Sequence, residues 1–493
     1  MSYPHIGLFI NNLADMLYNL LFFNVFFWSK TLYFPFLITW LLCGAIYCNY
    51  AYRVKNLRYI AKAVMLIFSR EENKKQIHER QKAELKQETS KSIVFTTIGS
   101  SIDTASMFGV ILAIKHCGVG VLFWVLFGGF AATSIRFSEA FLGHRYRVVS
   151  SDGTHYIGGP QIYIKEIFKR HFAKFGLSLA LFYNIAMAWS ILPSPQLNEA
   201  VNMSIYFFPP IANHRALFSF LLCLFVIGVT IGGFRRISTV IPKIVITVAC
   251  FYGIFSSIII FTHFQHLPGL LKSIVVDAFS VKAGLSGLLI LIATGLQRSF
   301  YSTEAGMGVA GIAHANSINK NSVQEGLFST VSPMFSAIFL CISSGVVTCL
   351  TGAQAIGSTD VEIMVLSYQS LYSSMHYVLL IIIPLSAMCT AINWAYYGIV
   401  SFSNMLKGRF ITLYIFLVFI CYFASCMITD FSVVLKLADV GSLSMGIPHL
   451  IAIFCATQFI NAHLKHKTKK NLTVMQKWKK YLLNKFSRTN HAF

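Results

Sequence analysis

The sequence has few charged residues. Only 12% of its 493 residues are Asp, Glu, Lys or Arg, whereas soluble domains carry about 25%. Hydrophobic residues make up 56% of the chain, and the mean hydropathy is +0.64. These values exclude an ordinary soluble domain. They predict an all-α polytopic membrane protein whose spanning segments form one integral domain.

Acidic residues are scarcer than basic ones. The chain has 18 Asp and Glu against 40 Lys and Arg, which gives a formal net charge of +22. Such an excess of positive charge can indicate a nucleic-acid partner. Here the basic residues lie in short loops and in the tail, where membrane topology places them. We therefore expect no nucleic-acid binding.

Motifs of catalysis and of metal binding are absent from the sequence. The eleven cysteines are scattered, mostly in apolar segments, without a CxxC or a Cys/His metal spacing, so we interpret them as small buried hydrophobic residues. There is no Walker loop, no HExxH sequence and no recognisable Ser/His/Asp set. The first apolar run lacks a basic leader and a cleavage site, so no cleavable signal peptide is expected. These absences predict a protein that is not an enzyme and has no cofactor.

Long apolar segments are frequent. Segment 5–29 is interrupted by Asn and Asp and predicts an interfacial helix, whereas 31–52 predicts the first span. Residues 53–91 hold eleven Lys/Arg against five Glu and predict a basic cytoplasmic segment, like the tail 463–493. Both basic segments are expected either to lie on the anionic inner leaflet or to be solvated. Ten further spans are predicted at 92–115, 118–141, 176–208, 216–233, 240–263, 283–312 (interrupted), 326–352, 376–402, 410–428 and 443–462.

The distribution of positive charge supports this count of eleven spans. The loops predicted to be inside carry most of the Lys and Arg, and the loops predicted to be outside carry fewer. The prediction is a multi-pass protein of the inner (plasma) membrane with a cytoplasmic C-terminus. Ten core spans within 92–462, with both ends inside, suit two five-helix halves of opposite orientation, at about 92–263 and 283–462.

The first helix of each half is predicted to be broken. Residues 100–109 read Ser-Ser-Ile-Asp-Thr-Ala-Ser-Met-Phe-Gly, and a carboxylate at membrane depth, Asp103, normally faces a partner or a wet cavity. Residues 294–308 are likewise small, polar and rich in glycine. We expect the interruption to affect 294–299, with Arg298 and Glu304 as a structural ion pair near the inner mouth. A broken helix exposes backbone groups that hold a substrate and its coupling ion, although a kink packed against neighbouring helices is the alternative.

Polar side chains of other spans are candidates for the same site. Two prolines open the third core span at Pro193-Ser-Pro-Gln-Leu-Asn-Glu199. Gln196 and Asn198 there suit a zwitterion or, alternatively, join neighbouring helices. Thr390 and Trp394 lie one helical turn apart and therefore share a face. The Thr390 hydroxyl suits a cation, and the Trp394 indole suits a small apolar side chain of the substrate. The alternative is that both residues serve only helix packing. In the second broken helix, Thr294, Gly295 and Ser299 are further pocket candidates.

Two other features carry structural expectations. Gly158-Gly-Pro-Gln-Ile-Tyr163 predicts a turn that opens a short amphipathic helix, with an inner-gate role as the alternative. His144, His314 and His449 lie at the ends of segments, where solvated or capping roles are expected.

Several of these stretches together resemble the alanine or glycine:cation symporter family, also called the sodium:alanine symporters. Ser302-Thr-Glu-Ala-Gly-Met-Gly-Val-Ala-Gly-Ile-Ala-His-Ala315 looks like the family's SNEAGMGSAPIAHA. Gly158-Gly-Pro resembles its GGPMYY, Gln196-Leu-Asn its QxN, and Trp394-Ala-Tyr-Tyr-Gly its WSYYG. Ile447-Pro-His-Leu-Ile resembles its IPNLI, and the likeness extends from about 53 to 455 in the family's order.

The resemblance implies a fold of the LeuT type in the APC superfamily, with one extra N-terminal helix. It implies Na⁺-driven uptake of alanine or glycine, without an obligate protein partner. It also implies a substrate site at Asp103, Thr104, Ser106, Gln196, Gly295, Ser299 and Trp394. The coupling sodium is expected between the carbonyls of Gly99 and Ile102 and the hydroxyl of Thr390.

The first broken helix departs from the family pattern. The family's VGTGN reads Ile102-Asp-Thr-Ala-Ser106 here, so that two glycines have become Asp103 and Ala105 and the asparagine has become Ser106. We expect one of three roles for Asp103: it binds a cation, it takes up a proton, or it marks a preference for a different substrate. The alternatives to sodium symport are accordingly a proton-coupled or amine-selective carrier that uses Asp103, and a channel.

Overall fold

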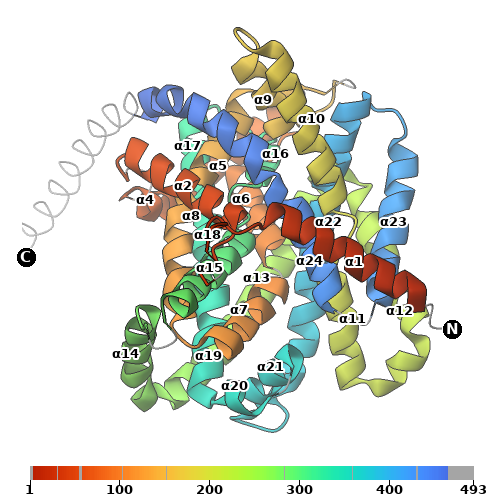
Figure 1. The fold of residues 1–493 in the computed structure, drawn as a ribbon. Helices are drawn as coiled ribbons and strands as arrows, with labels where there is room; N and C mark the ends of the chain where they lie inside the picture. The colour runs from red at the N-terminus through yellow and green to blue at the C-terminus, as the bar shows by residue number, and fades with distance from the viewer. Residues whose placement is uncertain are drawn as a thin grey trace, which may run out of the picture.

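Most long helices run between the upper and lower ends of the molecule in Figure 1. This computed structural model describes residues 4–29, 31–54, 58–102, 104–150, 153–281, 284–357, 359–428 and 431–464. The predicted helical, polytopic fold is confirmed. The sequence did not predict an antiparallel hairpin of β1 (Val148–Val149) and β2 (Tyr156–Ile157), in which Val148 pairs with Ile157.

Within the described residues, seven helices are long and apolar enough to cross a membrane. They are Val121–Arg145, Ala173–Phe207, Pro209–Thr230, Gly233–Thr262, Ser322–Thr351, Met375–Leu406 and Val433–Leu464. A bent pair of helices would make an eighth span. The expected spans 31–52 and 410–428 are apolar helices of 16 and 17 residues, and 283–312 holds two helices. The eleven-span count and the inverted repeat therefore stay predictions.

Nine helical segments surround the candidate site. They are α6 (Ser90–Ser101), α7 (Thr104–Cys117), α8 (Val121–Arg145), α10 (Ala173–Ser190), α11 (Pro195–Phe207), α15 (Gly284–Thr303), α16 (Val309–His314), α22 (Leu379–Leu406) and residues 446–464.

The remaining helices cover these elements or connect them. They are α1 (Pro4–Leu21), α2 (Phe36–Ala51), α4 (Ile60–Phe68), α5 (Arg70–Lys82), α9 (Pro160–Phe168), α12 (Arg215–Thr230), α13 (Gly233–Thr262), α14 (Leu267–Ala278), α17 (Ser322–Ser329), α18 (Val331–Met334), α19 (Ser343–Thr351), α20 (Ala353–Ile356), α21 (Asp360–Gln369), α23 (Ile411–Met427) and α24 (Phe431–Ser444). A π-helical stretch, Phe335–Ile342, joins α18 to α19.

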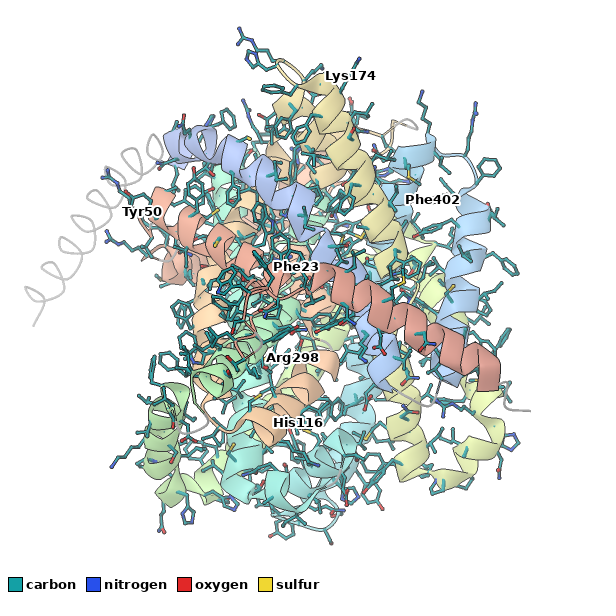
Figure 2. The ribbon with its side chains drawn as sticks, viewed as in Figure 1. Phe23, Tyr50, His116, Lys174, Arg298 and Phe402 are labelled. Atoms are coloured by element: carbon teal, nitrogen blue, oxygen red, sulfur yellow. The ribbon has the colours of Figure 1, made fainter. Side chains whose placement is uncertain are left out.

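The N-terminal helix α1 lies across the bundle rather than along it (Figure 1). It packs along α24, and Asp15 forms an ion pair of 2.7 Å with Lys436. The expected turn at 158–159 is present: Gly159 has φ +116° and α9 follows from Pro160. Figure 2 places Lys174 at the upper end of the molecule and His116 in its lower part.

Candidate functional site

The first predicted break is present. Helix α6 ends at Ser101, Ile102 leaves the helical region with ψ 70°, and α7 follows at Thr104. The segments Ser90–Ser101 and Ser106–Cys117 are bent by 41° relative to each other. Asp103 and the side chain of Thr104 lie outside the described residues. Ser106 is buried in the first turns of α7, where its carbonyl oxygen faces the Cys341 thiol at 3.7 Å.

Thr390 of α22 contacts the end of α6. Its Oγ1 donates to the carbonyl oxygens of Gly99 at 3.3 Å and Ile102 at 3.2 Å, and all three residues are buried. The break removes the usual intrahelical partners of the last carbonyls of α6. For a cation with oxygen bonds of about 2.4 Å, neighbouring ligand oxygens lie roughly 3.4 Å apart. The structure thus brings together the three residues predicted to share a cation, at a suitable spacing.

The second break lies at residues 304–308, between α15 and α16. Glu304, Gly306 and Gly308 have φ values of +52°, +94° and +79°, which no α-helix contains. The predicted location was wrong, because residues 294–299 form continuous helix within α15.

Close packing explains why the small residues before this break do not interrupt α15. A Cβ added to Gly295 would lie 2.6 Å from the Cβ of Trp124 and 2.9 Å from the carbonyl oxygen of Val121. A Cβ on Gly128 would lie 2.6 Å from the Cβ of Ser299. Gly295 and Ser299 therefore face α8, and small residues here allow two helices to approach closely.

Glu304 joins both breaks to α22. Its Oε2 accepts hydrogen bonds from Ser100 Oγ at 2.8 Å and from Arg136 Nη2 at 3.0 Å, and its Oε1 accepts one from Trp394 Nε1 at 2.9 Å. These donors belong to α6, α8 and α22 respectively. The carboxylate is 3% exposed and is held by donors from three helices, as a buried charge requires.

The expected ion pair of Arg298 with Glu304 is wrong. The guanidinium that pairs with Glu304 is that of Arg136. Arg298 lies against α7, where a Cβ on Gly109 would be 3.0 Å from its Cδ, and its charge acts on Asp439. Arg298 precedes Glu304 by six residues, more than one and a half helical turns, so its side chain leaves α15 in another direction.

Side chains satisfy the backbone groups that the second break releases. Glu139 Oε1 accepts hydrogen bonds from the amides of Gly306 at 2.8 Å and Gly308 at 3.2 Å. His449 Nδ1 donates to the carbonyl oxygen of Gly306 at 2.6 Å, and Tyr183 Oη donates to that of Met307 at 2.8 Å. Irregular backbone at membrane depth persists only with such partners.

The sequence interpretation missed Arg136, Glu139 and His449. The first two were recognisable as charged residues inside an apolar segment, which is a functional signal in itself. Of the two roles expected for His144, His314 and His449, solvation is wrong, because all three are buried. The bond of His449 to the carbonyl oxygen of Gly306 agrees with the other role, capping.

The third core span opens where its prolines predicted. Helix α10 ends at Ser190 and α11 begins at Pro195. Gln196, which is 8% exposed, lies in the first turn of α11, and α11 packs against both α7 and α22. Asn198 Nδ2 instead donates to the carbonyl oxygens of Ser425 and Ile428, at 2.7 and 2.6 Å. Asn198 therefore joins helices, whereas Gln196 is buried in the first turn of a helix that packs against α7 and α22.

The geometry assembles groups for reversible binding. Neutral oxygens of α6 and α22 converge at a spacing suited to a cation, and Trp394 lies one turn beyond Thr390. Both broken helices meet the same face of α22 through these contacts. Within the described residues, no group of three or more His, Cys, Asp and Glu side chains suits a transition metal.

The chain is similar to known proteins over most of its length. The sodium:alanine symporter family matches residues 20–480. The sodium/alanine symporter AgcS of Methanococcus maripaludis is 25% identical over 458 residues, which are 90% of this chain and 95% of that protein. A probable sodium/glutamine symporter, GlnT of Bacillus subtilis, is 26% identical over 76% of this chain and 77% of its own. An uncharacterized transporter of Haemophilus influenzae is 27% identical over 80% and 85% of the two chains.

Proposed function

The chain belongs to the sodium:alanine symporter family, and on that premise we propose that it carries alanine or glycine into the cell together with sodium by alternating access. The family consists of transporters rather than enzymes, and its relatives include proteins named for alanine and for glutamine. The observation that carries the proposal is the contact of the Thr390 hydroxyl with the carbonyl oxygens of Gly99 and Ile102.

Sodium is the proposed ligand of these three oxygens. A hard monovalent cation prefers neutral oxygen ligands, and the carbonyl end of a helix carries partial negative charge. When sodium binds, the Thr390 hydroxyl turns a lone pair toward the ion and releases its bonds to the carbonyls. Because two of the ligands come from α6 and one from α22, bound sodium holds these helices together.

The amino acid is proposed to bind beside the sodium, against α7, α11 and α22. The amides at the start of α7 suit its carboxylate, because the N-terminus of a helix carries partial positive charge. Gln196 and Ser106 supply neutral hydrogen-bonding groups, and the Trp394 indole limits the size of the side chain. Gly295 and Ser299 face α8, and they contribute by setting the position of α15.

Alternating access follows from moving the two broken helices relative to α22 around the bound solutes. Carrying one positive charge inward gains about 2.3 kcal/mol per 100 mV of membrane potential. That free energy supports roughly 50-fold accumulation of the amino acid. The ion gradient adds to this value.

The coupling ion and substrate are tested by uptake of labelled alanine and glycine into proteoliposomes. Three conditions are compared: an inward sodium gradient, an inward proton gradient and neither. Uptake is expected only with sodium, and Gln196→Ala should reduce it. Equal uptake under all three conditions would refute coupled symport.

The role of Thr390 is tested by two matched variants. Thr390→Val keeps the shape of the side chain but removes its oxygen, and it should raise the half-saturating sodium concentration about tenfold. Thr390→Ser keeps the hydroxyl and should stay close to the original value. If the valine variant responds to sodium like the original protein, the cation does not bind at Thr390.

Asp103 supports a second candidate, a proton-coupled or amine-selective carrier of the same fold. Its carboxylate stands where the family has glycine and would attract an ammonium group or a proton. Under this alternative, Asp103→Asn abolishes proton dependence or changes selectivity from amines to amino acids. Unchanged cation dependence and selectivity in Asp103→Asn would dismiss it.

A further inference from the structure

A cavity of about 200 Å³ lies beside the turn between α12 and α13. Five separate segments line it: residues 86–88 before α6, the turn of the β-hairpin, the α12–α13 turn, the loop after α16, and α22. The lining residues include Lys86, Glu88, His155, Arg235, Asn316 and Tyr396. A space of this volume holds several water molecules or one small oxyanion.

Backbone hydrogen bonds fix the walls of this cavity. The amide of Lys86 donates to the carbonyl oxygen of Thr154 at 2.7 Å, and the amide of Glu88 donates to that of Asn316 at 2.9 Å. The amide of Ile318 returns a hydrogen bond of 2.9 Å to the carbonyl oxygen of Glu88. Residues 86–88 are therefore held on both sides, and the cavity is a built feature of the fold.

The lining has an excess of positive charge. Lys86 and Arg235 are exposed at the cavity, and in the described part of the chain neither forms an ion pair. The carboxylate there, that of Glu88, is buried and already paired with Arg80 at 2.8 Å. Two cationic residues, Lys86 and Arg235, thus line a space whose acidic residue already forms an ion pair with Arg80.

The position of the cavity indicates where a ligand comes from. The α12–α13 turn joins two candidate membrane spans, so it lies at a membrane surface. Ile231 in this turn is 63% exposed and Arg235 follows four residues later. An apolar side chain beside a basic one suits a phospholipid, whose acyl chains and phosphate group require both.

We propose that this cavity, the inner anion pocket, binds a phosphate group carried by an anionic phospholipid of the adjacent leaflet or by free inorganic phosphate. Lys86 and Arg235 bind the phosphate oxygens. Lys86 lies shortly before Thr89, which caps α6, whereas Arg235 lies in the first turn of α13. A phosphate held by both side chains therefore joins the start of a broken helix to α13.

Binding is tested on the purified full chain in a neutral detergent by measuring its melting temperature. Three additions are compared at constant ionic strength: short-chain phosphatidylglycerol, short-chain phosphatidylcholine and inorganic phosphate. A rise with phosphatidylglycerol alone identifies the lipid as the source. A rise with inorganic phosphate as well identifies the free anion, and no rise with either overturns the proposal.

Neighbouring arginines provide the matched control. Arg235→Gln and Lys86→Gln should each weaken the apparent affinity for the effective anion about fivefold. Arg236→Gln should not, because Arg236 does not line the cavity and donates instead to the carbonyl oxygen of Gly228 at 3.2 Å. Equal effects of the two arginine variants would show a nonspecific attraction by net charge and would refute the pocket. The assay requires no transport, so it stands or falls independently of the proposed symport.

Discussion

Replacing Glu304 by glutamine should destabilise the junction of the two broken helices. One carboxylate oxygen accepts from Trp394 Nε1 at 2.9 Å, and the other accepts from Arg136 Nη2 at 3.0 Å and Ser100 Oγ at 2.8 Å. Indole and guanidinium nitrogens are donors only. In either orientation of the new amide, its NH₂ group faces a donor, so glutamine cannot reproduce both sets of hydrogen bonds.

The expected loss follows from burial and from the partners that remain. Removing one member of a buried ion pair costs about 3–5 kcal/mol. Arg136 retains Glu139 at 3.3 Å, which reduces the cost of leaving its guanidinium partly unpaired. We therefore expect a destabilisation of about 3 kcal/mol, at the lower end of this range.

The measurement is the apparent melting temperature of the purified protein in detergent. Glu166→Gln is the matched control, because Glu166 is 41% exposed and forms a surface ion pair with Lys169. Such pairs contribute about 0–1 kcal/mol. Glu304→Gln should lower the melting temperature by several degrees, and Glu166→Gln should leave it almost unchanged.

A double variant separates the donor conflict from a general loss of charge. Trp394→Phe removes the indole N–H, so the amide introduced by Glu304→Gln can turn its NH₂ group toward the phenyl ring. The combined loss should then be smaller than the sum of the two single losses. Strict additivity of the single effects would refute the reasoning.

Three further predictions concern packing. Gly306→Ala should lower the melting temperature more than Gly118→Ala. Both glycines have positive φ, so both variants carry the same backbone strain. At Gly306 the added Cβ would also lie 2.3 Å from Leu41 Cδ2, whereas at Gly118 it would meet open space. Gly143→Ala should cost more stability than Gly228→Ala, because its Cβ would lie 2.3 Å from the backbone of Gly311 whereas Gly228 has open space. Asn198→Ala should lose about 1–3 kcal/mol of stability, measured by melting, because it removes the two hydrogen bonds that its Nδ2 donates, while the KM for alanine in vesicles stays the same.

Local chemistry allowed part of the site to be predicted from the sequence. Small hydroxyl residues and a carboxylate inside an apolar segment predicted the break after Ser101, and two prolines predicted the opening before Pro195. The i, i+4 spacing placed Thr390 and Trp394 on one face, which does meet α6 and Glu304. Whether sodium and an amino acid bind there stays a prediction.

The sequence could not reveal the partner of Glu304. Arg298 is near in sequence, but the pair that forms joins Glu304 to Arg136, 168 positions away. Helix packing selects that partner, because α15 lies along α8. The same contact explains why Gly295 does not break its helix. Gly295 faces Trp124, and its small size allows α15 and α8 to pack closely. Composition alone does not distinguish these two uses of glycine.

The π-helical stretch Phe335–Ile342 lies within the span Ser322–Thr351, next to the first broken helix. Before the stretch, Ser332 donates to the carbonyl oxygen of Thr97; inside it, Ser336 Oγ donates to Ser101 Oγ at 2.7 Å, and near its end Cys341 faces Ser106. A π-turn contains one residue more than an α-turn. Losing one residue here would convert the stretch to ordinary helix and keep the two flanks in phase, whereas a deletion elsewhere in the span would rotate one flank by about 100°. This segment is therefore the place in the span where the chain can lose a residue while the helix on either side keeps its orientation toward the first broken helix.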